Sequence, residues 1–277
     1  MKIDVFSSDS SANTTLLRSN NTNILVDLGL NKKNILLNLD NFNLKFDDID
    51  AIFITHEHTD HVAGFPAIMN CYNGQIYMTK GTLEGIKAKF SSKPHFLEKL
   101  EDYIIAGHII ILRREKEALV YKRVGVGNFD IEPIKTFHDA KESCAYIFKS
   151  EEKSLVFITD TGIVHESLLP RLYNADGYIL ESNHDPEILM HSDRPYLLKK
   201  RILSDYGHLS NEDSMLVLAK SVGERTKLVM HAHISKECNL SNIIEKTRAR
   251  VLNEYNVDYT NIEFVILHPY PEKEHEI

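Results

Sequence analysis

The chain has 277 residues, of which 43% are hydrophobic and 26% charged, and its formal net charge is −8. This composition is typical of a globular protein with a large core, and the acidic balance argues against a general nucleic-acid-binding protein. No apolar run approaches the ~20 residues of a membrane span. The N-terminal segment becomes polar after residue 6 and lacks the apolar core of a signal peptide. The three cysteines do not have the spacing of metal ligands. We therefore expect a cytoplasmic protein with free thiols and no membrane partner.

Short β-branched runs alternate with helical patterns, which predicts a protein of mixed α and β structure. The predicted strands cover residues 2–6, 23–27, 51–55, 75–78, 143–149, 154–159, 178–181, 227–231 and 262–267. The predicted helices cover residues 31–38, 61–70, 81–90, 195–204, 211–222 and 239–254. Ser210 precedes an acidic first turn and is the predicted N-cap of 211–222, and Asn239 or Ser241 is the predicted cap of the last helix.

Two segments fit these patterns less well. Residues 91–128 contain the apolar run Ile109–Leu112 and a Gly125–Gly127 turn, and we interpret them as an inserted hairpin or helix pair. The rest of the chain shows no linker or repeat, so we expect one domain over residues 1–277. The tail 269–277 carries two prolines and mixed charge, which predicts fraying.

The clearest chemical signal is the segment Thr55-His56-Glu57-His58-Thr59-Asp60-His61. It follows the apolar run 51–54 and precedes a helical pattern. A strand that ends in a tight loop brings alternate side chains into one small volume, so His56 and His58 can face the same way. Asp60 and His61 begin the helix and can reach a second point nearby. Imidazole and carboxylate together suit zinc, manganese or iron; the alternative is a polar loop whose histidines cap backbone groups.

This HxHxDH segment after a strand resembles the first metal motif of the metallo-β-lactamase superfamily. The resemblance implies an α+β protein with the αββα four-layer sandwich of that fold. It also implies further ligands in a fixed order, and three residues occur in that order. His138 follows the strand-like run Ile131–Phe137, Asp160 comes at the end of the predicted strand 154–159, and His233 follows the predicted strand 227–231. By resemblance, one metal ion is held by His56, His58 and His138, a second by Asp60, His61 and His233, and Asp160 bridges the two.

Each of these later ligands has an alternative. Asp139 follows His138 directly, and His231 lies two residues before His233 at the end of a predicted strand, where it fits a buried core histidine. Asp160 precedes Gly162 and could simply form a turn. The Ile-Ser pair after His233 matches the superfamily pattern and favours His233 as the ligand.

The substrate class is indicated by Gly207-His208-Leu209-Ser210-Asn211. His208 resembles a histidine of the phosphodiesterase branch, which includes the tRNA 3′-processing enzymes and in which this residue is proposed to protonate the leaving group. An imidazole suits that role because it titrates near neutral pH. The alternative is a histidine that packs against or caps the following helix.

Four further strings resemble the YycJ/WalJ-type branch, whose members are described as 5′-to-3′ DNA exonucleases. They are SSDSSAN at 7–13, which is similar to a GSSSSGN loop, ESNHD at 181–185, LKKRILS at 198–204 and HISKECN at 233–239. Two positions depart from that pattern. Ala12 replaces a loop glycine, which weakens the case for close phosphate approach, and Cys238 stands where asparagine is usual.

Substrate contacts are predicted in three places. Ser10, Ser11 and Asn13 could hold a terminal phosphate, unless they only form a turn between strands. His184 could contact substrate or support a metal ligand. Phosphates could be bound by Lys199 and Lys200 on a helix, and by residues 80–123 with ten Lys/Arg against six Asp/Glu, unless both are ordinary solvated faces. Asp27 ends a strand and is expected to brace the metal loop.

We therefore predict a phosphodiester hydrolase acting on nucleic acid, DNA rather than RNA, as a 5′-to-3′ exonuclease. Two divalent ions, zinc, manganese or iron, would share the attacking hydroxide, with Asp60 orienting it and His208 protonating the departing oxygen. The alternatives are hydrolysis of a small cyclic phosphodiester, thioester or lactone, and a non-catalytic metal-dependent binding protein. Oligomeric state does not follow from the sequence.

Overall fold

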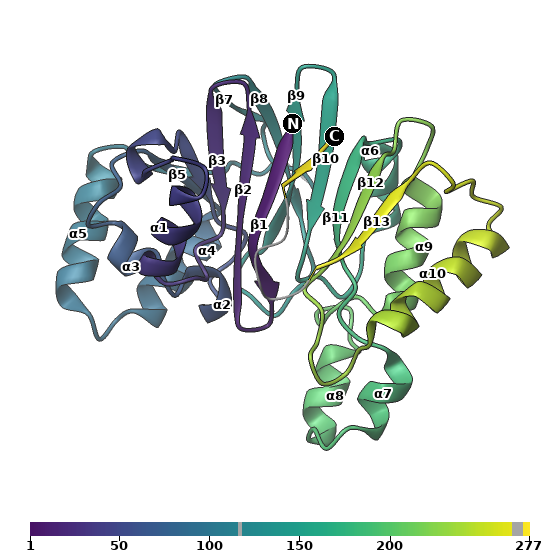
Figure 1. Cartoon of the computed structure of the whole chain (residues 1–277). Helices are drawn as coiled ribbons and strands as arrows, with labels where there is room; N and C mark the ends of the chain where they lie inside the picture. Colours follow the sequence, from purple (N-terminus) through teal and green to yellow (C-terminus); the bar gives the residue numbers. More distant parts are fainter. Residues whose placement is uncertain (116–117, 268–273) are drawn as a thin grey trace. The chain divides into compact units, whose positions relative to one another are not determined.

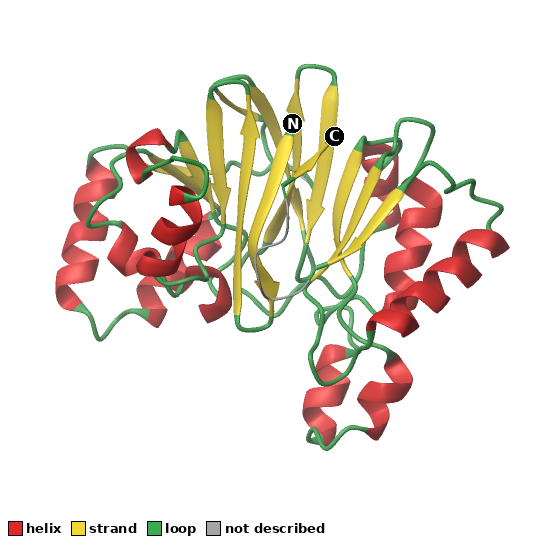
Figure 2. Ribbon diagram, viewed as in Figure 1, coloured by secondary structure: helices red, strands yellow, loops and turns green. Residues whose placement is uncertain are grey.

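The computed structural model describes residues 1–115, 118–267 and 274–277, which form two compact units (Figures 1 and 2). The first unit runs from Met1 to Lys135 and also includes Ala140–Cys144 and residues 274–276. The second unit contains Thr136–Asp139, residues 145–267 and Ile277. The expectation of one domain over the whole chain stays a prediction.

The first unit is built on a mixed sheet in the order β14-β1-β2-β3-β4-β5-β6. Strands β14, β1, β2 and β3 pair antiparallel, whereas β3 to β6 pair parallel. The bounds are β1 Lys2–Asp9, β2 Ala12–Ser19, β3 Thr22–Val26, β4 Ala51–Phe53, β5 Gln75–Met78, β6 Ile109–Ile111 and β14 His275–Glu276. A further antiparallel hairpin joins β7 Val124–Val126 to β8 Phe129–Lys135.

One hydrophobic core joins this sheet to its helices. The helices are α1 Lys32–Asp40, α2 Thr59–Val62, α3 Phe65–Ile68, α4 Lys80–Lys89 and α5 Pro94–Ile105. Leu25 and Ile52 on the sheet belong to the same buried cluster as Ile35 of α1, Phe65 of α3 and Leu100 of α5. Burial of these side chains places the carboxyl ends of the parallel strands β3 and β4 against α2, where the HxHxDH segment lies.

The second unit contains the strands β13-β12-β11-β10-β9, parallel from β10 to β13 and antiparallel between β9 and β10. Their bounds are β9 Cys144–Ser150, β10 Lys153–Ile158, β11 Gly177–Glu181, β12 Leu228–Ala232 and β13 Glu263–Ile266. The helices are α6 Leu169–Leu172, α7 Pro186–His191, α8 Tyr196–Ile202, α9 Asn211–Ser221 and α10 Ser241–Glu254. A separate small cluster of Leu189, Ile202 and Cys238 holds α7 and α8 together.

Most predicted elements are present within a few residues of their predicted ends, and the N-cap at Ser210 is confirmed by its bond from the Asp213 N–H. The single helix over 61–70 is wrong, because α2 ends at Val62 and α3 begins at Phe65 with Gly64 as its N-cap. Gly64 has no room for a Cβ atom, which would lie 2.2 Å from the Leu30 carbonyl oxygen. Neither Asn239 nor Ser241 is the N-cap of α10; that position is Leu240, without a side-chain capping bond.

Three loop assignments also need correction. The segment 7–13 is not a loop, since β1 continues to Asp9 and β2 begins at Ala12, leaving only two turn residues. Residues 91–128 form α5, β6 and β7 rather than a lone hairpin or helix pair. The fraying predicted for the tail is wrong for His275–Glu276, which pair with β1, while residues 269–273 lie outside the described residues. None of the described helices combines the length and apolar character needed to cross a membrane.

Helix α5 allows a matched test of the first unit's core. Leu100 is fully buried and Ile105 on the same helix is 83% exposed. We expect Leu100→Ala to lower the free energy of unfolding by about 2–5 kcal/mol because it leaves a cavity, and Ile105→Ala to change it by less than about 0.5 kcal/mol. Urea denaturation followed by circular dichroism measures both. Equal losses in the two variants would contradict the packing described for α5.

Candidate metal centre

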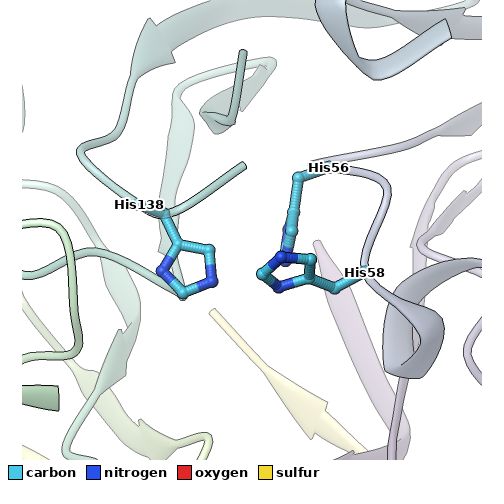
Figure 3. A group of neighbouring side chains, drawn as sticks. All are labelled: His56, His58 and His138. Atoms are coloured by element: carbon cyan, nitrogen blue, oxygen red, sulfur yellow. The ribbon is translucent and has the colours of Figure 1, made fainter. Parts of the chain in front are cut away.

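The first unit carries four of the seven predicted ligands, with His56 and His58 between β4 and α2 and with Asp60 and His61 in the first turn of α2. The rings of His56 and His58 lie edge to face with centroids 4.6 Å apart (Figure 3), and the His61 ring centroid lies 4.1 Å from that of His56. His58 occupies the N-cap position of α2 but makes no side-chain capping bond. The histidine side chains therefore lie close together, and His58 does so without capping the helix through its side chain.

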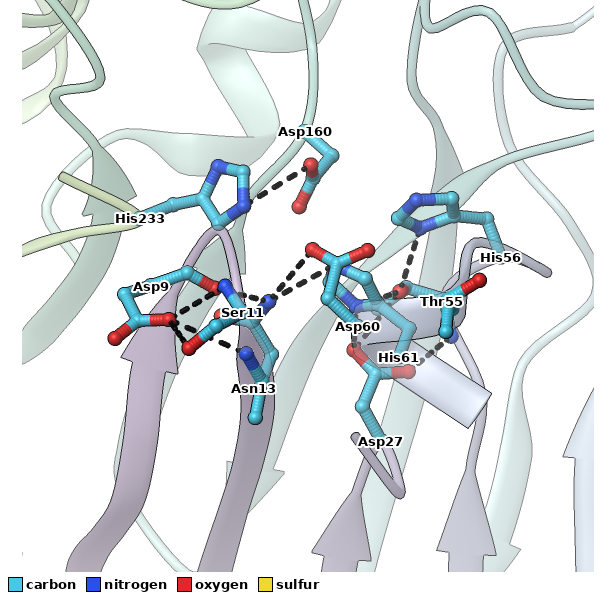
Figure 4. Close-up of polar contacts among 12 residues, drawn as sticks. Asp9, Ser11, Asn13, Asp27, Thr55, His56, Asp60, His61, Asp160 and His233 are labelled. Atoms are coloured by element: carbon cyan, nitrogen blue, oxygen red, sulfur yellow. Dashed lines mark hydrogen bonds and ion pairs between the residues drawn. The ribbon is translucent and has the colours of Figure 1, made fainter. Parts of the chain in front are cut away.

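Asp27 orients His61 from the end of β3. Its carboxylate accepts hydrogen bonds from the Thr55 N–H and hydroxyl, each at 2.8 Å, and from His61 Nδ1 at 2.7 Å (Figure 4). Burial raises the pKa of Asp27, and the neighbouring His61 opposes that shift. Since Nδ1 of His61 is held, Nε2 is the nitrogen that can face a metal ion, the usual arrangement of a carboxylate behind a metal-binding histidine. This is the bracing position expected for Asp27.

Asn13 lies beside these residues rather than at the turn. Its Nδ2 is 3.1 Å from His61 Nε2 and 3.2 Å from Asp60 Oδ2, and it donates to the Asp9 carbonyl at 2.9 Å. Gly29 permits this approach, since a Cβ atom there would lie 1.8 Å from the Asp60 carbonyl oxygen. Among the three residues predicted to hold a phosphate, only Asn13 contacts the ligand loop.

Ser10 and Ser11 form the exposed turn between β1 and β2. The backbone N–H of Ser11 and its hydroxyl both donate to the Asp9 carboxylate. Those donors, which the prediction assigned to a phosphate, are therefore already used within the protein.

The second unit carries His138 and its neighbours. His138 Nδ1 donates to the Gly207 carbonyl at 3.0 Å, and Nε2 lies 3.8 Å from Asp160 Oδ1. The rival ligand Asp139 approaches His138 Nε2 at 3.2 Å but also pairs with Arg201 at 2.9 Å. Asp139 belongs to none of the groups of described residues that could hold a metal ion, whereas His138 does.

Four residues of the second unit form one compact polar cluster, within which the potential ligand atoms lie within 4.8 Å of one another: Asp160, Glu181, His208 and His233. His233 Nε2 lies 3.4 Å from Asp160 Oδ1 (Figure 4). Asp160 and His233 have positive φ angles of 54° and 53°. Such strained backbone is uncommon for residues other than glycine and is concentrated at functional sites.

Glu181, at the end of β11, organises this cluster. Its Oε1 accepts hydrogen bonds from His208 Nδ1 at 2.7 Å and His233 Nδ1 at 2.9 Å, and its Oε2 accepts from the Thr161 N–H at 3.0 Å. Burial alone would raise the pKa of Glu181, but His208 and His233 lower it to about 2. Glu181 begins the ESNHD string, and a charged residue at the end of an apolar strand is the signal that the sequence offers for it, although no role was predicted for Glu181.

His184, from the same string, is 1% exposed, and neither ring nitrogen has a hydrogen-bond partner among the described residues. Burial lowers its pKa to about 4. The substrate contact assigned to His184 stays a prediction, as does its alternative role of supporting a metal ligand. His231 is a core residue, since its Nδ1 lies 3.1 Å from the Ser182 hydroxyl and burial lowers its pKa to about 3.

The two lysines predicted to bind phosphate differ in their surroundings. Lys199 Nζ donates to the carbonyls of Met190 at 2.8 Å and Ser192 at 2.6 Å, at the end of α7. Lys199 therefore has a structural role at the end of α7, and its contact with substrate stays a prediction. Lys200 is exposed and forms no hydrogen bond or ion pair with another described residue.

The donor set and its support fit divalent metal ions. Nδ1 is held by a protein acceptor in His61, His138 and His233, which leaves Nε2 of each available for coordination. A mixture of imidazole and carboxylate suits zinc, manganese or iron. The described residues thus include clusters suited to holding metal ions.

The beta-lactamase superfamily domain matches residues 22–232 of this chain. The exodeoxyribonuclease WalJ of Streptococcus pneumoniae is 36% identical over 252 residues, covering 91% of this chain and 88% of that protein. The chain belongs to the metallo-β-lactamase superfamily. Within it, the chain falls in the WalJ/YycJ branch, and the exodeoxyribonuclease YycJ of Bacillus anthracis is 28% identical over 257 residues, covering 92% and 90% of the two chains.

Solved structures agree with the predicted α+β metallo-β-lactamase fold. The metallo-β-lactamase fold protein YhfI of Bacillus subtilis matches with a TM-score of 0.67 at 17% identity, covering 97% of both chains. The short form of human tRNase Z matches with a TM-score of 0.65 at 16% identity, covering 100% of this chain and 99% of that one. The predicted fold class and family are confirmed, and the protein is a metal-dependent hydrolase.

Asp27→Asn tests the support of His61. The amide cannot accept from both Thr55 and His61 as the carboxylate does, so we expect zinc affinity to fall by about 10- to 100-fold. Asp176→Asn is the control, because that buried carboxylate binds Ser154 and Arg225 away from any candidate ligand. Competition with a chromogenic chelator measures affinity. If Asp176→Asn weakens zinc binding as much, Asp27 has no particular role.

Glu181→Gln tests the second cluster through its pH dependence. The folded-state pKa of Glu181 lies below its ordinary value of 4.5, so its stabilising contribution is present above about pH 4.5 and is lost as pH falls toward 2. We expect the variant to be less stable than the wild type at pH 6, with a difference that shrinks between pH 5 and pH 3. Urea titrations of metal-free protein measure this. A difference that does not vary with pH would refute the ion-pair account.

Proposed function

We propose that this protein hydrolyses phosphodiester bonds in DNA and removes nucleotides stepwise from the 5′ end. The observation that carries the proposal is the shared Glu181 carboxylate, which holds His208 and His233 by Nδ1 in one cluster with Asp160. A histidine oriented in this way beside carboxylate and imidazole ligands is suited to a hydrolase that must also protonate a leaving group. The exodeoxyribonuclease names of WalJ and YycJ support DNA as the substrate.

We assign two divalent ions, zinc, manganese or iron, to the predicted ligands. His56, His58 and His138 would hold one ion, and Asp60, His61 and His233 the other, with Asp160 between them. These residues supply the imidazole and carboxylate donors that such ions prefer. When bound, the ions would activate water and neutralise charge on the phosphate oxygens.

His208 is the assigned proton donor. Its Nδ1 is engaged by Glu181 at 2.7 Å, so Nε2 is the nitrogen left for a leaving oxygen. Its side chain keeps 13% of its surface exposed, unlike His184. Ser210, not His208, caps α9, so the capping alternative for His208 does not apply.

Asp60 is assigned to orient the attacking water. Its side chain is 20% exposed, and Oδ2 receives a hydrogen bond from Asn13 at 3.2 Å. Lys200 and Arg201 on α8 are assigned to the phosphate backbone, since both side chains are exposed and cations of this kind supply sequence-independent affinity.

The test uses purified wild type and the variants His208→Ala and Asp60→Ala with Mn²⁺ or Zn²⁺. Substrates are end-labelled DNA and RNA with 5′-phosphate or 5′-hydroxyl, and bis-p-nitrophenyl phosphate. We expect metal-dependent, stepwise loss from the 5′ end of DNA, reduced at least about 100-fold in both variants. Lys220→Ala, which removes an exposed lysine that pairs with Glu166 on the second unit, is the control and should retain activity.

Different outcomes would lead to different conclusions. Turnover of bis-p-nitrophenyl phosphate with every polymer intact would indicate that the substrate is a small phosphodiester and not DNA. Full metal binding without turnover of any ester would favour a binding protein. Loss from the 3′ end would keep the nuclease assignment but overturn the direction.

A further inference from the structure

A buried carboxylate lies in the turn where the sequence predicts a phosphate contact. Asp9 is the last residue of β1 and is 1% exposed. Its Oδ1 accepts the backbone N–H of Ser11 at 2.5 Å and that of Ala12 at 3.2 Å, and it also accepts the Ser11 hydroxyl (Figure 4). Three donors therefore converge on a single oxygen atom that belongs to the protein itself.

These donors are of the kind that bind anions. Successive backbone N–H groups directed at one point form an anion-binding concavity, and a serine hydroxyl beside them is a common donor to phosphate oxygens. Asp9 takes up all three donors and places its own negative charge at their focus. A substrate phosphate that approached this turn would find these donors engaged and would be repelled by the carboxylate.

The turn is coupled to the candidate ligands through one side chain. Asn13 Nδ2 donates to the Asp9 carbonyl at 2.9 Å and lies 3.2 Å from Asp60 Oδ2 and 3.1 Å from His61 Nε2. A single amide nitrogen thus contacts the backbone of Asp9 and two residues of the ligand loop. Asp9 is therefore linked to two candidate metal ligands through one intervening side chain.

We propose that Asp9 is a specificity-determining residue that excludes a 5′-terminal phosphate, so that the site favours ends carrying a 5′-hydroxyl. The inference rests on the proposed function, because it concerns the end group of the same substrate. Asp9 touches no reacting atom and acts through its charge and through the donors that it engages.

A carboxylate that accepts N–H groups two and three residues ahead is also a common way to stabilise a turn. Asp9→Asn separates the two roles. The asparagine Oδ1 can accept the same backbone hydrogen bonds, whereas the negative charge is removed. Asp50→Asn is the matched control, since Asp50 also accepts a backbone N–H, that of Asn23 at 2.8 Å, and lies exposed in the same unit.

The experiment measures binding of phosphorothioate oligonucleotides with a 3′-fluorescein and either a 5′-phosphate or a 5′-hydroxyl, by fluorescence anisotropy with Mn²⁺. We expect wild type and Asp50→Asn to bind the 5′-hydroxyl form more tightly. Asp9→Asn should raise the affinity for the 5′-phosphate form relative to the 5′-hydroxyl form by on the order of tenfold. Its thermal unfolding midpoint should stay within a few degrees of wild type.

Two results would overturn the proposal: a wild-type preference for the 5′-phosphate, or a shift in Asp9→Asn no larger than in Asp50→Asn. Cleavage of unmodified oligonucleotides is measured in parallel. If wild-type protein discriminates between the end groups in binding but cleaves no polymer, the exonuclease assignment fails while the role of Asp9 stands. If it cleaves DNA without discriminating, the role of Asp9 fails alone.

Discussion

The polar cluster of the second unit depends on the two hydrogen bonds that the Glu181 carboxylate accepts from His208 and His233. One buried oxygen accepts from both imidazoles, at 2.7 and 2.9 Å. A buried carboxylate without such partners would be costly, so the ion pairs that lower the pKa of Glu181 also keep both rings in place. The other oxygen accepts backbone N–H groups from Thr161 and Leu209, and the loops that follow β10 and precede α9 are thereby tied to the same residue.

In the first unit, Asp27 holds a histidine ring in place as Glu181 does in the second unit. This carboxylate is fully buried at the end of β3 and binds Thr55 and His61. In both units a strand ends on an acidic residue that is directed at a histidine rather than at water. Backbone strain accompanies the arrangement, because Asp27, Asp160 and His233 all have positive φ angles just beyond β3, β10 and β12. Strain at such positions persists only where the surrounding contacts hold it, and the paired carboxylates supply those contacts.

The β1–β2 turn shows how one side chain can engage the hydrogen-bond donors of its own turn. The string SSDSSAN resembles a serine-rich loop suited to a phosphate, but the third residue is an aspartate whose carboxylate engages the available donors. Asn13, four residues later, lies on the opposite side of the turn and contacts the ligand loop. Residues that are adjacent in the sequence thus have distinct roles once the strand pairing is known.

By itself, the sequence determined the family, the fold class and the candidate ligands. The HxHxDH segment and the later histidines and aspartate occur at strand ends that periodicity can identify, and ligand chemistry restricts the residue types. Strand β2, the break at Gly64 and helix α5 escaped prediction, because their polar or mixed residues follow tertiary burial rather than a regular pattern. Only the tertiary structure decided that Glu181 binds two histidines and that His184 is buried. It also decided that Lys199 donates to backbone carbonyls and that Asp9 accepts the hydrogen bonds of its own turn. Each of these depends on where a side chain points after strands distant in sequence have paired, and local spacing carries no information about that.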